Sequence, residues 1–237
     1  MHRHRVIALA VACAAVAASS CGAAADMAFR ADRSATVTLA VEVPAAVESR
    51  IRQFAASGLS SASGASAPLF DSAAVSASAA ARGLAVRSSS APDPRTYKGT
   101  FVVPDLRALL DADRDLATVL EYSSGSGRGS IRLRVDRDNA GAVAALFPGV
   151  DGELLESLQP PALYDNPVSA AEYRSMLAGL LGKAAVAAMD GASIVISASF
   201  PGHITDSGPG VTVDASRKTA RMSIPAIEAM VLERPVV

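Results

Sequence analysis

The chain is poor in the side chains that most often carry chemistry. Its 237 residues include no tryptophan, two cysteines and three histidines. Both cysteines, Cys13 and Cys21, lie in the first 21 residues, and His203 is the only histidine beyond them. The rest of the chain therefore has no disulfide, no cysteine nucleophile and no cysteine ligand for zinc. We interpret His203, in a Pro-Gly-His loop, as a solvated residue rather than a base or a metal ligand.

An excess of charge of one sign is also missing. The chain has 22 basic and 23 acidic residues, and no run of Lys and Arg of the kind that indicates a nucleic-acid partner. It has no Gly-x-Ser-x-Gly motif followed by a suitable acid and histidine. The glycine-rich stretch around Ser126 joins two predicted strands instead of opening a helix, which argues against a phosphate-binding loop there.

Acidic side chains are the remaining candidates for chemistry. Asp111, Asp113 and Asp115 lack the glycine and the distal glutamate of a calcium-binding loop, so we interpret them as a charged turn. Glu153 and Glu156 lie three residues apart on a predicted helix, and a solvated face explains them more simply than an acid pair. We therefore expect no catalytic residue, no metal and no cofactor. An envelope hydrolase with a site of Asp and Glu is the alternative.

What the sequence does contain is the layout of an export signal. Met1 to Arg5 is basic, Val6 to Ala18 is apolar, and the small residues Ser19 and Ser20 precede Cys21. An apolar helix of about 13 residues spans about 20 Å, less than the roughly 30 Å hydrocarbon core of a bilayer. This layout predicts a signal peptide rather than a permanent membrane span.

The end of this segment, Ala18-Ser19-Ser20-Cys21, resembles the lipobox of bacterial lipoproteins. Ala18 replaces the usual leucine, and Ser20 replaces the commoner glycine or alanine. The resemblance implies cleavage between Ser20 and Cys21, a diacylglyceryl group on Cys21, and anchoring in the inner or outer membrane with the domain facing the periplasm or the exterior. Cleavage there leaves one cysteine, at the position that lipidation requires. The alternative is an ordinary signal peptide cut near Ala23–Ala25, which discards Cys21.

Beyond the leader, a unit of two strands and one helix recurs. Thr36 to Val43 alternates apolar and polar residues, Met27 to Ala31 is its predicted hairpin partner, and Pro44 opens a helix. Three similar units follow, with predicted strands at 84–88 and 97–103, at 118–122 and 130–136, and at 193–200, 211–213 and 221–224.

Hairpins with one apolar face predict an α+β fold, a mainly antiparallel sheet with helices on one face. A helical insert at about 150–182 separates the last two units, and Ser169 with Glu172 forms a predicted capping box in it. We divide the chain into a signal peptide at 1–20, a lipidated tether at 21–25 and one domain at 26–237.

A few surface features bear on function. Leu163 and Tyr164 lie in a proline-bounded loop, where packing back onto the sheet competes with a docking role. The open sheet face is polar, with Thr36, Thr38, Arg132 and Arg134.

The hairpin segment Phe29-x-x-Asp32-x-Ser34-x-Thr36-Val37 resembles little-characterised spirochaete lipoproteins and, more distantly, LppM-type lipoproteins. The latter resemblance implies binding of lipids or glycolipids. We expect a non-enzymatic envelope lipoprotein that binds an apolar ligand or an envelope protein partner, with a structural subunit of an envelope assembly as a further alternative.

Overall fold

A computed structural model of the protein describes residues 22–56, 68–125, 127–144, 161–162 and 167–237. The predicted signal peptide and several residues discussed above lie outside these ranges: Ser20, Cys21, Ser126, Glu153, Glu156, Leu163 and Tyr164. The described residues form mixed helices and strands around a mainly antiparallel sheet, which confirms the predicted α+β fold.

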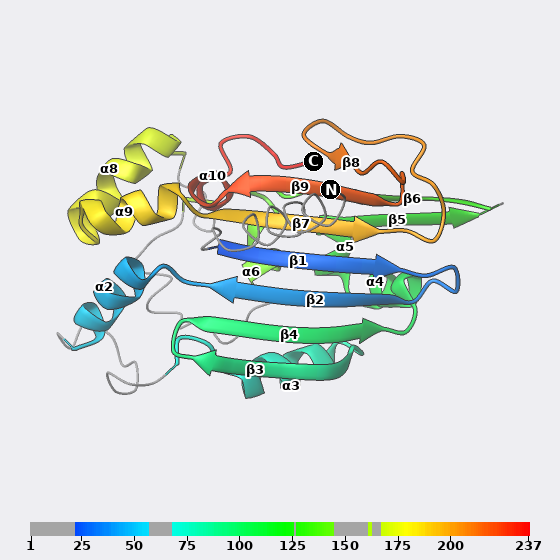
Figure 1. The fold of residues 1–237 in the computed structure, drawn as a ribbon, viewed down its shortest axis with the longest axis horizontal. Coiled ribbons are helices and arrows are strands. Elements are labelled where there is room, and N and C mark those ends of the chain that lie inside the picture. Colours follow the sequence, from blue (N-terminus) through cyan, green and yellow to red (C-terminus); the bar gives the residue numbers. More distant parts are fainter. Residues whose placement is uncertain (1–21, 57–67, 126, 145–160, 163–166) are drawn as a thin grey trace, which may run out of the picture.

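Seven strands form the main sheet, in the order β3-β4-β2-β1-β7-β9-β8 (Figure 1). Every neighbouring pair is antiparallel except β1 and β7, which run parallel. The strands are β1 Gly22–Phe29, β2 Ala35–Glu42, β3 Ala85–Asp93, β4 Thr96–Val103, β7 Ser193–Ser199, β8 Thr212–Val213 and β9 Thr219–Pro225. A separate two-stranded sheet pairs β5 Leu120–Gly125 with β6 Arg128–Leu133.

The main sheet is amphipathic across its whole width. Residues that pair directly across strands point to the same face, so a row of partners shows the character of that face. One row is entirely polar: Ser88, Thr100, Thr38, Asp26, Ser197, Arg221 and Thr212. The adjacent row is entirely apolar: Val86, Phe101, Val37, Met27, Ala198, Ala220 and Val213.

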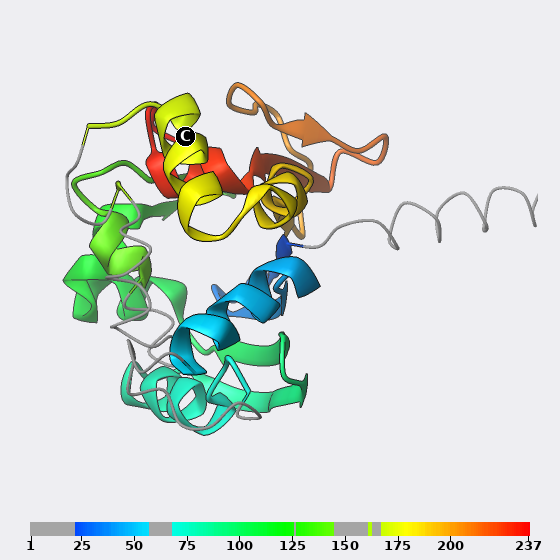
Figure 2. The same ribbon diagram turned by 90° about the vertical axis from the view of Figure 1, so that its left-hand side faces the viewer.

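The described helices and the β5–β6 hairpin lie on the apolar side of the sheet or at one end of it (Figures 1 and 2). Helices α3, α4, α5 and α6 lie behind the sheet in Figure 1, whereas α2, α8 and α9 gather at its left-hand end. Their bounds are α2 Ala45–Ala56, α3 Ser72–Ala81, α4 Leu106–Ala112, α5 Arg114–Val119, α6 Ala140–Ala144, α8 Ala170–Leu180, α9 Lys183–Asp190 and α10 Ala226–Val231.

The four predicted strand-strand-helix units are present, and three details differ from the prediction. The third unit, β5, β6 and α6, forms its own small sheet instead of joining the main one, and Thr118 lies in α5 rather than in its first strand. The first strand starts earlier than expected, because Gly22 already pairs with Glu42 and Ser193. Residues 22–25, assigned above to a tether, are therefore part of β1.

Buried side chains fall into separate clusters rather than one continuous core. The largest lies at the helical end, where Tyr173 and Leu177 of α8 meet Val186 of α9, Ile227 of α10 and Val47 of α2. A second joins Ala35 and Val103 to Leu106 and Leu120, and a third joins Val75 to Tyr97 and Phe101. The predicted capping box at the start of α8 is confirmed, with the Ser169 hydroxyl accepting from the Glu172 N–H.

Candidate functional site

The apolar side of β1, β7 and β9 carries side chains that belong to none of these buried clusters. Met27, Ile194, Ile196, Met222 and Ile224 form what we call the apolar strip. Ile196 lies directly opposite Met222, and Ile194 lies opposite Ile224. All five side chains are only half-buried. Their burial is incomplete even though they point to the side on which α3, α4 and the β5–β6 hairpin lie.

Aromatic rings close one end of the apolar strip. Phe29, at the end of β1, stacks on Phe200, just after β7, with ring centroids 5.3 Å apart and planes inclined by 15°. Two of the five strip residues are methionines, whose flexible and polarisable side chains adapt to ligands of irregular shape. Such a surface can bind hydrocarbon by burial of apolar area and offers no group for acid–base chemistry.

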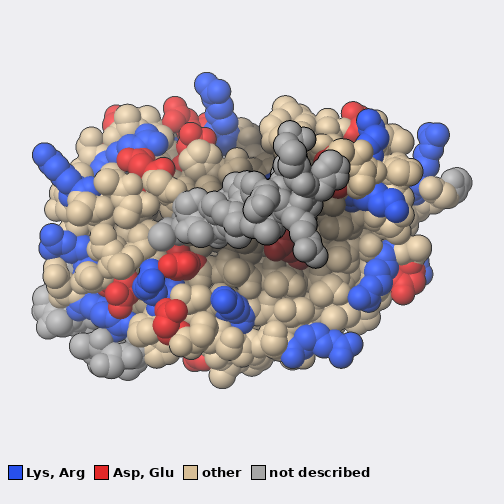
Figure 3. All heavy atoms as spheres, in the orientation of Figure 1, with Lys and Arg blue, Asp and Glu red and all other residues tan. Residues whose placement is uncertain are grey.

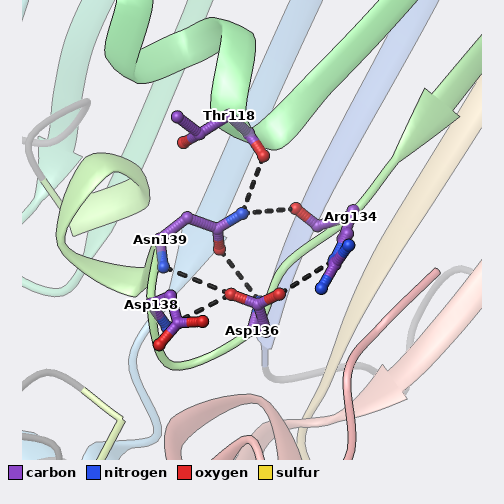
Figure 4. Close-up of polar contacts among 5 residues, drawn as sticks. All are labelled: Thr118, Arg134, Asp136, Asp138 and Asn139. Carbon is purple, nitrogen blue, oxygen red and sulfur yellow. Dashed lines mark hydrogen bonds and ion pairs between the residues drawn. The ribbon is translucent and has the colours of Figure 1, made fainter.

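The densest polar network among the described residues lies elsewhere, in the turn after β6 (Figure 4). The buried amide of Asn139 donates to the carbonyl oxygens of Thr118 and Arg134, at 2.8 and 2.9 Å. Its oxygen accepts from the N–H of Asp136 at 2.9 Å. The Asp136 carboxylate in turn accepts from the N–H groups of Asp138 and Asn139 and from Arg134 Nε. Each of these polar groups forms a hydrogen bond with a backbone group or with a neighbouring side chain, which indicates a structural role.

Arg137, in the middle of this turn, extends the same role to distant segments. Its Nε donates to the carbonyl oxygen of Val231 at the end of α10, and its Nη2 donates to that of Val168 just before α8, both at 3.2 Å. Neither Arg137 nor Asn139 is among the residues to which the sequence alone assigns a role. The Asp-Arg-Asp-Asn run after an alternating strand is an Asx-turn signal that predicts the turn, but it says nothing about the distant carbonyls.

Among the described acidic residues considered above, Asp113 caps a helix, Asp111 forms a surface ion pair and Asp115 lies in the first turn of α5. Asp113 caps α5 by accepting from the Leu116 N–H at 3.0 Å, and its other oxygen pairs with Arg82 of the loop after α3. Asp111 Oδ2 lies 3.9 Å from Arg107 Nε on the surface of α4. His203 is exposed, and its Nδ1 contacts the carbonyl oxygen of Ser216 at 3.2 Å. Among the described residues, no three or more His, Cys, Asp or Glu side chains converge as metal ligands would.

Shifted pKa values also mark structural positions in the described parts of the chain. Burial raises the pKa of Tyr173, which lies inside the helical cluster. Hydrogen bonds from Ser34 lower the pKa of Asp32, and those from Ser216 and Thr219 lower that of Asp214. The N–H of Arg95 lowers the pKa of Asp93, and that of Ser169 lowers the pKa of Glu172. These four carboxylates lie in hairpin turns or at a helix start, where the hydrogen bonds that they accept stabilise their ionised form.

The polar face of the main sheet is shown in Figure 3. Acidic and basic side chains are interspersed over the part of this face that the structure describes, with no large area of one sign. Thr36 and Thr38 belong to this face, whereas Arg132 and Arg134 lie on or beside the separate β5–β6 hairpin.

Comparison with known protein families, characterised proteins and solved structures gives no significant match. None of the helices described here is both long enough and apolar enough to cross a bilayer.

Proposed function

We propose that this chain is an envelope lipoprotein, anchored through a lipid on Cys21, whose domain binds an apolar ligand along the apolar strip instead of catalysing a reaction. The half-buried side chains of Met27, Ile196 and Met222, outside every buried cluster, are the observation that supports ligand binding. The domain then faces the periplasm or the exterior, and its partners are the membrane and the apolar ligand.

The anchor is supported by the sequence of the leader and by the cysteine count. Two or three acyl chains hold a protein stably on a membrane, at about 0.8 kcal/mol per buried CH₂, whereas one chain binds only marginally. A protein anchored in this way needs no membrane-spanning helix of its own.

Expression in a bacterial host with a radiolabelled fatty acid tests the anchor. We expect the wild type to carry label and to sediment with membranes, and Cys21→Ala to lose both. Alanine is small, so the variant leader still resembles a signal peptide and export continues. An unlabelled wild type in the soluble fraction would show that the leader is cut elsewhere and Cys21 is discarded.

Binding of a dansyl-labelled fatty acid tests the apolar strip. Ile196 lies on the strip, whereas its neighbour Val195 points to the polar face, and both side chains are half-buried. Ile196→Thr removes apolar contact worth about 1 kcal/mol and is expected to weaken binding about fivefold. Val195→Thr keeps a β-branched residue in the same strand and should leave the affinity unchanged. Equal effects of the two substitutions, or no binding by the wild type, would contradict a ligand on this strip.

A further inference from the structure

Two large apolar side chains project into solvent at one end of the molecule. Met176 and Leu180 of α8 are 38% and 43% exposed, and among the described residues only one other large hydrophobic side chain, Val237, is as exposed. Next to them on the same apolar stripe of the helix, Tyr173 and Leu177 are 0% exposed in the helical cluster. Packing within the described chain therefore covers only part of the apolar stripe of α8, and the edge that carries Met176 and Leu180 faces solvent.

The chain enters the sheet at this same end. Gly22, the first residue of β1, pairs with Glu42 and with Ser193. Three residues beyond Glu42 the chain begins α2, and three residues before Ser193 it ends α9, which packs against α2 and α8. Figure 2 looks onto this end, with α2, α8 and α9 facing the viewer and the start of β1 between α2 and α9.

No residue lies between the proposed anchor, Cys21, and the first residue of β1. Cys21 directly precedes Gly22 in the sequence, and consecutive Cα atoms are about 3.8 Å apart. Gly22 is fixed by strands on both sides, and a Cβ at this position would come within 2.1 Å of the Ser193 carbonyl oxygen. A lipid on Cys21 would consequently hold the bilayer against the end of the sheet, where a flexible tether would have let the domain turn freely.

Charge at this end favours an apolar contact over an electrostatic one. Helices α2, α8 and α9 carry four basic residues, Arg50, Arg52, Arg174 and Lys183, against three acidic ones, Glu48, Glu172 and Asp190. Arg52 is paired with Glu48, and Arg174 with Asp190 at 2.7 Å. A nearly neutral surface gains little from anionic lipids.

We propose that the end formed by α2, α8 and α9 rests on the phospholipid bilayer, with Met176 and Leu180 inserted at the level of the headgroups beside the lipid on Cys21. This inference rests on the proposed anchor. Two side chains alone bind a membrane weakly, and the anchor makes their contact effectively intramolecular.

A tryptophan reporter tests the contact, because the chain has no tryptophan of its own. The lipidated protein carrying Met176→Trp is reconstituted into phosphatidylcholine vesicles with and without brominated acyl chains. We expect a blue shift and a loss of most of the emission with brominated lipid, unchanged at high salt. Ser124→Trp, an exposed position near the tip of the β5–β6 hairpin, is the matched control and should keep its emission.

Each of the other possible results contradicts either the membrane contact alone or the contact and the anchor together. Equal emission loss for both reporters, or loss that disappears at high salt, overturns the apolar contact while the anchor stands. A blue shift without quenching overturns it in favour of a protein partner or a second copy on α8. Mass spectrometry of the same sample reports the acyl groups on Cys21, and an unmodified, soluble product would overturn the anchor and this membrane face together.

Discussion

At the scale of single residues, the side chain that this structure depends on most clearly is Asn139. It is 9% exposed, yet its amide makes three hydrogen bonds to backbone groups, one to Thr118 in α5 and two to Arg134 and Asp136 just after β6. No apolar residue of similar size can replace these bonds, because the two carbonyl groups and one N–H would remain without a partner in a partly buried turn.

Asn139→Ala should therefore be costly. We expect a loss of about 2–3 kcal/mol in the free energy of unfolding, measured by urea denaturation. Asp138 is the matched control, because it is exposed and only its backbone N–H takes part in the network. Asp138→Ala should change the stability by less than about 0.5 kcal/mol. Equal stabilities of the two variants would show that the Asn139 bonds are replaced by water at little cost.

At the scale of elements, three hairpin turns of the main sheet are closed by an aspartate. Asp32 lies in the β1–β2 turn, Asp93 at the β3–β4 turn and Asp214 between β8 and β9. In the last, the carboxylate accepts from the Ser216 hydroxyl at 2.7 Å and from the N–H groups of Lys218 and Thr219 at 2.9 and 3.0 Å. All three carboxylates accept hydrogen bonds from the backbone, which holds the turn residues in register.

These turns should loosen in acid. Hydrogen bonds lower the pKa of Asp214 in the folded state, so their stabilisation is present above the unfolded pKa of about 3.9 and is lost as the pH falls through the lower folded value. We expect exchange of the Lys218 and Thr219 amide hydrogens, corrected for the intrinsic rate, to accelerate below about pH 4. Asp214→Asn keeps an acceptor but cannot titrate, so its corrected exchange should be flat over this range. The same acid response in Asp214→Asn would place its origin outside the turn.

Also at this scale, the sequence predicted local pairing well and distant pairing not at all. The alternation from Thr36 to Val43 predicted β2, observed at Ala35–Glu42, and Pro44 and Pro225 immediately precede α2 and α10 as expected. The parallel pairing of β1 with β7 joins residues about 170 positions apart, and alternation specifies a face but not a neighbour. For the same reason, alternation alone does not show that the β5–β6 hairpin forms a sheet of its own.

The candidate site was predictable only in part. Alternation identifies Ile196 and Met222 as apolar-face residues, but only the structure shows that Val75 of α3 and Leu106 of α4 help to bury Phe101 and Val103 of β4 while the strip stays half-buried. The sequence does not distinguish the exposed pair on α8, because Met176 and Leu180 continue the apolar pattern of Tyr173 and Leu177. A broad apolar stripe in a sequence does not reveal how much of it the neighbouring helices cover.

At the scale of the whole molecule, the β5–β6 hairpin lies outside the main sheet but packs against it, because Leu120, Tyr122, Ile131 and Leu133 belong to the cluster around Ala35 and Val103. The segment after the hairpin makes further contacts with α10 and the C-terminal segment. Arg137 binds the end of α10, and Val135 pairs with Val236 near the C-terminus through two backbone hydrogen bonds of 2.9 and 2.8 Å. Val135 and Val236 also pack on a small cluster of Ala140, Ala162 and Leu232. The C-terminal segment therefore links the hairpin to α10 and, through α10, to the helical end.

Removal of one of these backbone bonds should loosen the hairpin without unfolding the sheet. Val236→Pro eliminates the N–H that donates to the Val135 carbonyl, at a cost of about 1 kcal/mol. We expect hydrogen exchange at Val135 and along β6 to speed up about fivefold, while amides shared by β7 and β9 keep their protection. Val237→Ser, at a position that is 44% exposed, should change neither the exchange along β6 nor that of the amides shared by β7 and β9. Equal acceleration in β6 and β7 would mean that the two sheets unfold as one unit, and that the tail stabilises the whole domain because both sheets depend on the helical end to which it is tied.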